Sequence, residues 1–312
     1  MPAHVLEALG LSRHFGDVVA VDSIDLQVGE GEVVAVLGPN GAGKTTTIEM
    51  LLGLRTPTSG TVRVFGGDPT SAAVRGRVGA MLQDTDAPDS LTVAEIVDLV
   101  AAYYPYRLAT ADVLERASLT GHRRRRVTQL SGGERQRLSF ALAIVGDPDL
   151  LYLDEPTASL DVGARRAFWR QVQAFAALGK TILFSTHNLE EADLVAGRVV
   201  IIDHGRIHSD STPRELKGLL AGRTLELLTD ADEAELAALP GVRGVTLLPA
   251  DPVGPGADAG PADLRRVRLQ AADATPPLRT LFAAGRRVEG LVVTEATLEE
   301  AFVHLSSPEA AR

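Results

Sequence analysis

A glycine-rich segment, Gly38–Thr45 (GPNGAGKT), combines residue types that can hold a chain of phosphates. Its glycines let the backbone turn tightly, so that N–H groups point inward at an anion. Lys44 adds a full positive charge, and Thr45 offers a hydroxyl group to Mg²⁺. The predicted nucleotide-binding residues here are Gly38, Pro39, Asn40, Gly41, Ala42, Gly43, Lys44, Thr45 and Thr46.

The apolar segment Leu150–Pro156 (LLYLDEP) ends in two carboxylates. As a buried strand of a parallel sheet, it would place these acids at the carboxyl end, beside the glycine-rich turn. Asp154 would hold Mg²⁺, and Glu155 would polarise the water that attacks the terminal phosphate. Taken alone, the segment is also compatible with a strand that ends in a solvated acidic turn. The P-loop pattern of Gly38–Thr45, which lies between a strand and a helix, favours the catalytic interpretation.

The segment Leu130–Arg137 (LSGGERQR) precedes the paired acids. It resembles the signature motif of ABC ATPases, which few other P-loop proteins carry. Ser131, Gly132 and Gly133 open a predicted helix, whose first N–H groups can bind an anion. The resemblance implies that this surface closes over ATP held by a second copy, giving a homodimer around the nucleotide. A Ser-capped helix without that role is the alternative.

The same resemblance assigns further positions in chain order. Phe15 corresponds to the aromatic residue that stacks on adenine, although a core position is the alternative. Gln83 corresponds to the glutamine that links Mg²⁺ and the attacking water to a helical subdomain; alone, it would be read as polar surface. Ser159–Asp161 corresponds to the loop that crosses the dimer interface, with Asp161 near the nucleotide. His187 corresponds to the histidine that contacts the γ-phosphate, or is an ordinary loop histidine.

Two domains are expected to position these residues. Short apolar strands that alternate with helices over 1–222 indicate an α/β domain with a mainly parallel sheet. A helical subdomain is predicted at about 86–145, and the resemblance to an ABC cassette adds N-terminal antiparallel strands. Residues 223–312 follow the order β-α-β-β-α-β of a small ferredoxin-like α+β domain. The Pro- and Gly-rich segment 249–263 is predicted to be a loop within it.

Composition limits the functional classes. The 312 residues carry a net charge of −10, which disfavours broad attraction to nucleic acid or anionic lipid. The absence of cysteine excludes disulfides and thiolate metal sites, and fits a reducing compartment. No signal peptide and no apolar run of membrane-spanning length are apparent, so a transport pathway would belong to another chain.

Together these features predict the ATP-hydrolysing subunit of an ABC transporter, with ATP and Mg²⁺ as cofactors. The catalytic residues would be Lys44, Gln83, Glu155 and His187, and the metal ligands Thr45, Gln83 and Asp154. The C-terminal segment TEATLEEAFVHLS resembles the daunorubicin-resistance-like branch, which pairs with ABC-2-type membrane exporters. The chain is therefore expected on the cytoplasmic face of the membrane, bound to an integral membrane permease. A soluble ABC ATPase acting on ribosomes or DNA is the alternative. The transported substrate, and the role of Arg123–Arg126, stay open.

Overall fold

The computed structural model describes residues 4–82, 88, 90–158, 160–219, 223–249, 264–295 and 298. The chain divides into two compact units, Met1–Pro213 and Arg214–Arg312. Each unit has its own hydrophobic core. Among the described residues, no helix is both long and apolar enough to cross a membrane.

A six-stranded sheet forms the centre of the first unit, with the strand order β5-β6-β7-β3-β8-β9. The first five strands run parallel, and β9 forms an antiparallel hairpin with β8. Nearly every residue of the central strands is buried, as their continuous apolar sequences predict. In chain order the strands are β3 (Val33–Leu37), β5 (Val78–Met81), β6 (Leu150–Asp154), β7 (Thr181–Thr186), β8 (Arg198–Asp203) and β9 (Arg206–Ser211).

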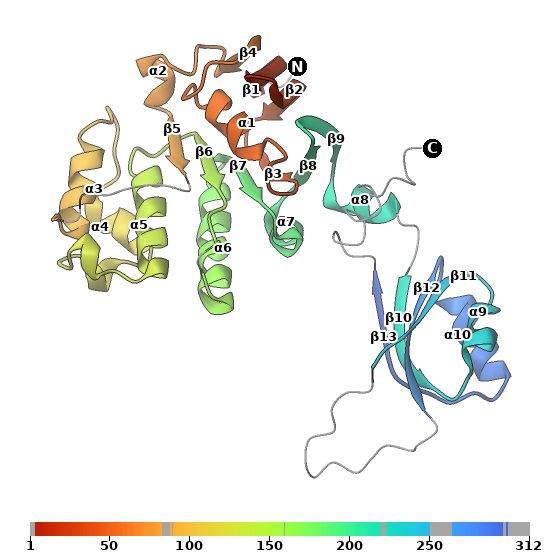
Figure 1. Cartoon of the computed structure of the whole chain (residues 1–312). Helices are drawn as coiled ribbons and strands as arrows, with labels where there is room; N and C mark the ends of the chain where they lie inside the picture. The colour runs from red at the N-terminus through yellow and green to blue at the C-terminus, as the bar shows by residue number, and fades with distance from the viewer. Residues whose placement is uncertain are drawn as a thin grey trace. The chain divides into compact units, whose positions relative to one another are not determined.

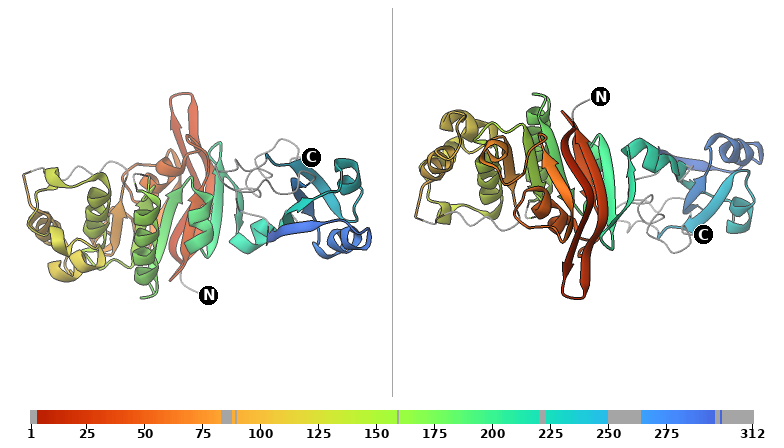
Figure 2. Two further views of the ribbon diagram at one scale, coloured as in Figure 1. Left: turned by 90° about the horizontal axis from the view of Figure 1, so that it is seen from below. Right: turned by 90° about the horizontal axis from the view of Figure 1, so that it is seen from above.

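A three-stranded antiparallel sheet, ordered β2-β1-β4, lies against the central sheet and shares its core. Its strands are β1 (His4–Phe15), β2 (Val18–Gly29) and β4 (Ser59–Val64). Both views in Figure 2 show the long β1–β2 ribbon, in red, running beside the green strands of the central sheet. The helices of this part are α1 (Lys44–Leu51), α2 (Ala72–Arg75), α6 (Val162–Ala176) and α7 (Leu189–Val195). The expected antiparallel N-terminal strands are thus confirmed.

The helical subdomain lies to one side of the central sheet, where Figure 1 shows α3, α4 and α5 together. They are α3 (Val93–Ala101), α4 (Thr110–Arg116) and α5 (Gly132–Ile144), with the 3-10 turns η1 (Thr120–His122) and η2 (Val127–Gln129). Thr92 caps α3 through a reciprocal capping box with Glu95. Residues 86, 87 and 89 at the predicted start of this subdomain lie outside the described residues.

The boundary between the two units falls at the start of α8 (Pro213–Leu219), and the second unit continues with a four-stranded antiparallel sheet ordered β11-β12-β10-β13. The elements are β10 (Arg223–Thr229), α9 (Glu233–Ala237), β11 (Val242–Leu247), β12 (Arg265–Ala271), α10 (Thr275–Ala283) and β13 (Val288–Glu295). Helices α9 and α10 both cover the same face of the sheet, as Figure 1 shows. This order and sheet arrangement confirm the predicted ferredoxin-like unit. Most of the loop 249–263, and the last predicted helix apart from Leu298, lie outside the described residues.

Candidate functional site

The glycine-rich turn joins the end of β3 to the start of α1, as predicted. Gly43 precedes the first residue of α1 with a left-handed backbone, φ 101°. Two hydrogen bonds brace the turn: Ala42 N–H donates to the Pro39 carbonyl (3.2 Å), and Gly205 N–H donates to the Ala42 carbonyl (3.0 Å). The positive end of α1 therefore opens onto this turn, which favours binding of an anion there.

Two glycines of this turn leave no space for a larger residue. A Cβ atom on Gly38 would lie 2.1 Å from the carbonyl oxygen of Ile202 on β8. One on Gly43 would lie 2.4 Å from the carbonyl oxygen of Ala20 on β2. In contrast, a Cβ atom on Gly41, whose φ is +82°, would meet nothing within 4 Å. Strands β8 and β2 thus pack directly against the turn at Gly38 and Gly43, and they restrict these two positions to glycine.

We expect Gly43→Ala to lower ATP affinity by about tenfold or more. The left-handed backbone costs an L-residue about 1–2 kcal/mol, and the clash with Ala20 adds to that strain. Gly41→Ala is the matched control, because it carries the positive φ without the clash. Equilibrium titration with a fluorescent ATP analogue measures both variants. Equal losses in the two variants would contradict a steric role for the contact between β2 and the turn.

Lys44 points back into its own turn in this structure. Its Nζ donates to the carbonyls of Gly38 (2.7 Å) and Pro39 (3.1 Å), and lies 3.9 Å from Glu155 Oε1. Burial lowers the pKa of Lys44, while the charges of Glu155 and Asp154 oppose this shift. A phosphate entering the turn would therefore meet a cation that is already desolvated and held in place.

Asp154 ends β6 beside Ser185 of β7, its partner in the parallel register. The Ser185 hydroxyl donates to Asp154 Oδ1, whereas the buried Oδ2 has no hydrogen-bond partner among the described residues. A buried carboxylate oxygen without a donor suits a cation. Among the described residues, no three His, Cys, Asp or Glu side chains are grouped so that they could hold a metal ion by themselves. Asp154 and Thr45, which is exposed in the first turn of α1, can therefore provide only part of a Mg²⁺ site, as expected where phosphate and water complete the coordination.

Glu155 is held in an unusual backbone conformation directly after this strand. Its φ is +48°, a region that a non-glycine residue occupies only when its surroundings compensate. Its N–H donates to both the carbonyl (3.2 Å) and the hydroxyl (3.0 Å) of Ser185. Its Oε2 lies 2.7 Å from Nδ1 of the exposed His187. The structure thus brings Lys44, Asp154, Glu155 and His187 together.

Phe15 is the last residue of β1, at the β1–β2 hairpin. The same hairpin lies against the glycine-rich turn, because the Ala20 carbonyl of β2 lies close to Gly43. Phe15 is 40% exposed, and the nearby Val18 and Val19 are also exposed. The guanidinium groups of Arg13 and Arg55 lie 4.8 and 5.1 Å from the ring centroid. The alternative core position for Phe15 is therefore wrong, and an accessible apolar surface is available to a nucleotide base. The sequence analysis did not identify the two valines, although their place beside Phe15 in a hairpin could have suggested them.

The signature residues form the start of α5. Ser131 caps the helix by accepting from Glu134 N–H (3.3 Å), and Glu134 accepts from Ser131 N–H (2.7 Å). Ser131 and Gly132 are exposed, and nothing lies within 4 Å of a Cβ atom on Gly132. The helix contacts the segment that follows β6 through Gln136, whose side chain donates to the Pro156 carbonyl (2.6 Å). The start of α5 is thus exposed at Ser131 and Gly132, where an external ligand can approach it.

The remaining assigned positions are only partly described. Asp161 is the N-cap of α6 and accepts from Ala164 N–H at 2.8 Å. Gln83 and Ser159 lie outside the described residues. Sequence reasoning missed Ser185, which bonds Asp154 and the Glu155 N–H, and Gln136, which bonds the carbonyl of Pro156 next to Glu155. Ser185 could have been suspected, because it occupies the carboxyl end of a buried strand just before His187.

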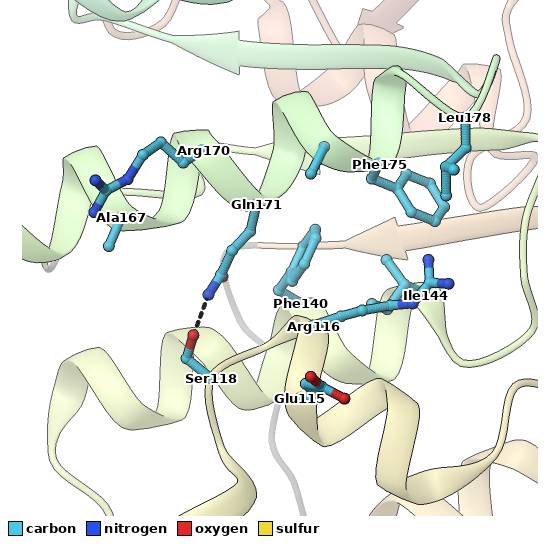
Figure 3. A pocket seen from close by; sticks show the side chains of 11 residues that line it. Glu115, Arg116, Ser118, Phe140, Ile144, Ala167, Arg170, Gln171, Phe175 and Leu178 are labelled. Atoms are coloured by element: carbon cyan, nitrogen blue, oxygen red, sulfur yellow. Dashed lines mark hydrogen bonds between the residues drawn. The ribbon is translucent and has the colours of Figure 1, made fainter.

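A pocket of about 560 Å³ lies elsewhere, between α4, α5 and α6 (Figure 3). Phe140, Ile144, Phe175 and Leu178 line its apolar part, and Gln171 donates to the Ser118 hydroxyl across it (2.5 Å). None of the predicted site residues lines this pocket. It is therefore separate from the cluster around Glu155.

Known proteins resemble this chain in sequence and in fold. Residues 21–158 match the family model described as ABC transporter. The daunorubicin resistance ATP-binding protein DrrA2 of Streptomyces coeruleorubidus is 35% identical, over 98% of this chain and 96% of that protein. The Nod factor export ATP-binding protein I of Cupriavidus metallidurans is 40% identical, over 68% of this chain and 72% of that protein. A solved ATP-binding subunit of an ABC transporter is 27% identical with a TM-score of 0.63, over 69% of this chain and 92% of that one. The chain therefore belongs to the family of ATP-binding, ATP-hydrolysing subunits of ABC transporters, in the branch that includes the daunorubicin resistance proteins.

Proposed function

We propose that this chain powers an ABC-2-type exporter by closing as a homodimer around ATP and Mg²⁺. The observation that carries the proposal is the cluster in which Glu155 lies between Lys44 and His187. A cation, a buried carboxylate and an accessible imidazole at the mouth of a phosphate-binding turn suit phosphoryl transfer to water.

Within one chain, each residue has a distinct proposed role. Lys44 turns from the loop carbonyls to the phosphates, since a phosphate is a stronger partner than a neutral carbonyl. Asp154 and Thr45, with Gln83, hold Mg²⁺, which neutralises charge on the phosphates when bound. Glu155 accepts a proton from the attacking water, and His187 orients Glu155 and contacts the γ-phosphate.

The second half of the ATP site comes from the other copy. Ser131 and Gly132 are exposed and Gly133 is half-buried at the start of α5, and the Ser131 hydroxyl with the Gly132 and Gly133 N–H groups suits the γ-phosphate of ATP bound to a partner copy. Phe15 receives the adenine ring on its exposed face. Asp161, at the exposed start of α6, lies on the segment assigned to the dimer interface. ATP then contributes contacts to both copies, so its binding favours closure and its hydrolysis favours opening.

The permease is proposed to bind at a pocket between α1, α2, β4 and β5, within the ATPase domain 1–222. Its lining is mainly apolar and includes Leu52, Leu54, Val74, Leu82 and Tyr104. Leu82 immediately precedes Gln83, so movement there would reach the assigned catalytic glutamine directly. The relatives named for drug resistance and Nod factor export support a role in export. In that role the chain would bind the permease at the cytoplasmic face of the membrane. The domain 223–312 is proposed as an accessory domain of this assembly.

We expect affinity purification of the full chain from native membranes to recover an integral membrane protein. Leu54→Glu should reduce this recovery severalfold, because it puts a charge on a 59% exposed apolar side chain of the pocket. Leu178→Glu is the matched control, since Leu178 is 57% exposed and lines the pocket of Figure 3. Recovery of ribosomes or DNA without a membrane protein would favour the soluble alternative. If the two variants recover equal amounts of the membrane protein, the docking site does not include Leu54.

A further inference from the structure

Glu191, in the first turn of α7, is a buried carboxylate that neither the motifs nor the proposed chemistry uses. It is only 3% exposed. The Thr157 hydroxyl donates to its Oε1, and the Thr186 hydroxyl donates to its Oε2 at 2.9 Å. Arg165 Nε lies 3.3 Å from Oε1, within ion-pair distance but without hydrogen-bond alignment. Both carboxylate oxygens are therefore engaged, which a buried charge requires.

Each of these partners belongs to a segment that carries an assigned functional residue. Thr157 follows Glu155 in the turn after β6, and Thr186 directly precedes His187 at the end of β7. Arg165 lies in the first turn of α6, where its N–H donates to the carbonyl of Asp161 (2.8 Å). One side chain thus connects the segments of Glu155, His187 and Asp161. Figure 1 shows β6, β7, α6 and α7, which carry this cluster, side by side.

The direction of these hydrogen bonds makes the cluster sensitive to charge. A carboxylate only accepts, so both threonine hydroxyls must turn their protons toward Glu191. The Thr186 oxygen remains free to accept, and it does so from Asn188 N–H at 3.0 Å. A glutamine in place of Glu191 would present an NH₂ group to one of the two hydroxyls, and it would leave Arg165 without the countercharge.

We propose that Glu191 is a positioning residue that sets the 2.7 Å contact between Glu155 and His187 by joining the segments on which they lie. The inference rests on the proposed catalytic roles of Glu155 and His187. Glu191 is not among the residues assigned to ATP, Mg²⁺ or the attacking water. Its carboxylate holds Thr157 and Thr186, and through them it fixes the base and the histidine for the closed state. The same link connects the site to Asp161, on the segment assigned to the dimer interface.

The test is steady-state hydrolysis by the full chain carrying Glu191→Gln. We expect kcat to fall about 10- to 100-fold with little change in KM for ATP, because a displacement of about 1 Å at a reacting group can cost about 10²-fold. Equilibrium ATP affinity should stay near that of the unchanged chain. Glu190→Gln is the matched control: it removes the same charge from the exposed neighbouring residue and should leave kcat unchanged. Thr157→Val and Thr186→Val should each lower kcat less, and each should be non-additive with Glu191→Gln.

A kcat for Glu191→Gln equal to that of the unchanged chain would overturn the inference. So would parallel losses of kcat, ATP affinity and thermal stability, because these indicate a purely structural role. If Glu191→Gln does not fold, the two threonine variants decide the question by the same split between kcat and KM. Glu155→Gln, assayed alongside, separates the two hypotheses. Hydrolysis by that variant would refute the proposed function itself, whereas its inactivity beside a fully active Glu191→Gln would refute only the role of Glu191.

Discussion

Replacing Glu155 with glutamine is expected to stop ATP turnover while leaving two chains held together by bound ATP. Glutamine has nearly the same shape, so the phosphate-binding turn and the Ser185 contacts to the backbone N–H survive. It cannot accept the proton of the attacking water, and loss of a general base costs roughly 10²- to 10⁴-fold in rate. Because hydrolysis reopens the dimer, the ATP-bound closed state should accumulate.

Two measurements on the purified full chain check this result. Single-turnover hydrolysis reports the chemical step, and light scattering after size exclusion with Mg²⁺ and ATP reports the mass. The same variant with ADP should elute as a monomer. Adding Ser131→Arg to Glu155→Gln should also restore the monomer, since the arginine fills the open space at the start of α5. A monomer of Glu155→Gln at saturating ATP would contradict the sandwich, and normal turnover would contradict the role of the base.

Residues in the local motifs could be predicted from sequence because chain connectivity alone positions them. A strand, a glycine-rich turn and a helix form one continuous segment around Lys44, and Asp154 and Glu155 follow their strand directly. Short apolar runs such as Leu150–Leu153 account for the buried central strands, and the positive φ of both His204 and Gly205 accounts for the tight turn between β8 and β9.

Contacts between segments could not be predicted in this way. The Ser185 hydroxyl reaches Asp154 only because β6 and β7 are parallel neighbours in one particular register, which no single strand sequence specifies. Gln136 reaches the Pro156 carbonyl only because α5 lies against the end of β6. Such hydrogen bonds depend on the packing of distant elements, so a sequence pattern can suggest the residue type but not its partner.

The contacts of the run Arg123–Arg126 likewise could not be predicted from sequence. A run of like charges is usually a solvated face, and Arg123, Arg124 and Arg126 are exposed. Arg125 differs, since its guanidinium donates to Glu134 Oε1 at 3.0 Å, beside the contact between His122 and the same carboxylate. Hydrogen bonds from Ser131, followed by the charges of Arg125 and His122, lower the pKa of Glu134. The run therefore helps to keep the capping acid of the signature helix ionised.

Replacing Lys44 with alanine is expected to abolish detectable ATP binding, and turnover with it. A unit charge pair at about 4 Å and an effective dielectric near 20 contributes about 4 kcal/mol before desolvation, so the affinity loss approaches 10³-fold as an upper bound. The Lys44 side chain is buried beside the turn before the nucleotide arrives, so it only has to turn from the loop carbonyls to the phosphates, and little of that attraction is spent on ordering it. Isothermal titration with ATP measures the loss. Lys180→Ala is the matched control, because Lys180 pairs with Asp147 (3.0 Å) and Asp149 (3.6 Å) in loops away from the turn. Unchanged hydrolysis by Lys44→Ala would mean that the phosphates bind elsewhere. Equal losses of ATP affinity in both variants would mean that Lys44 acts only through the net charge of the chain.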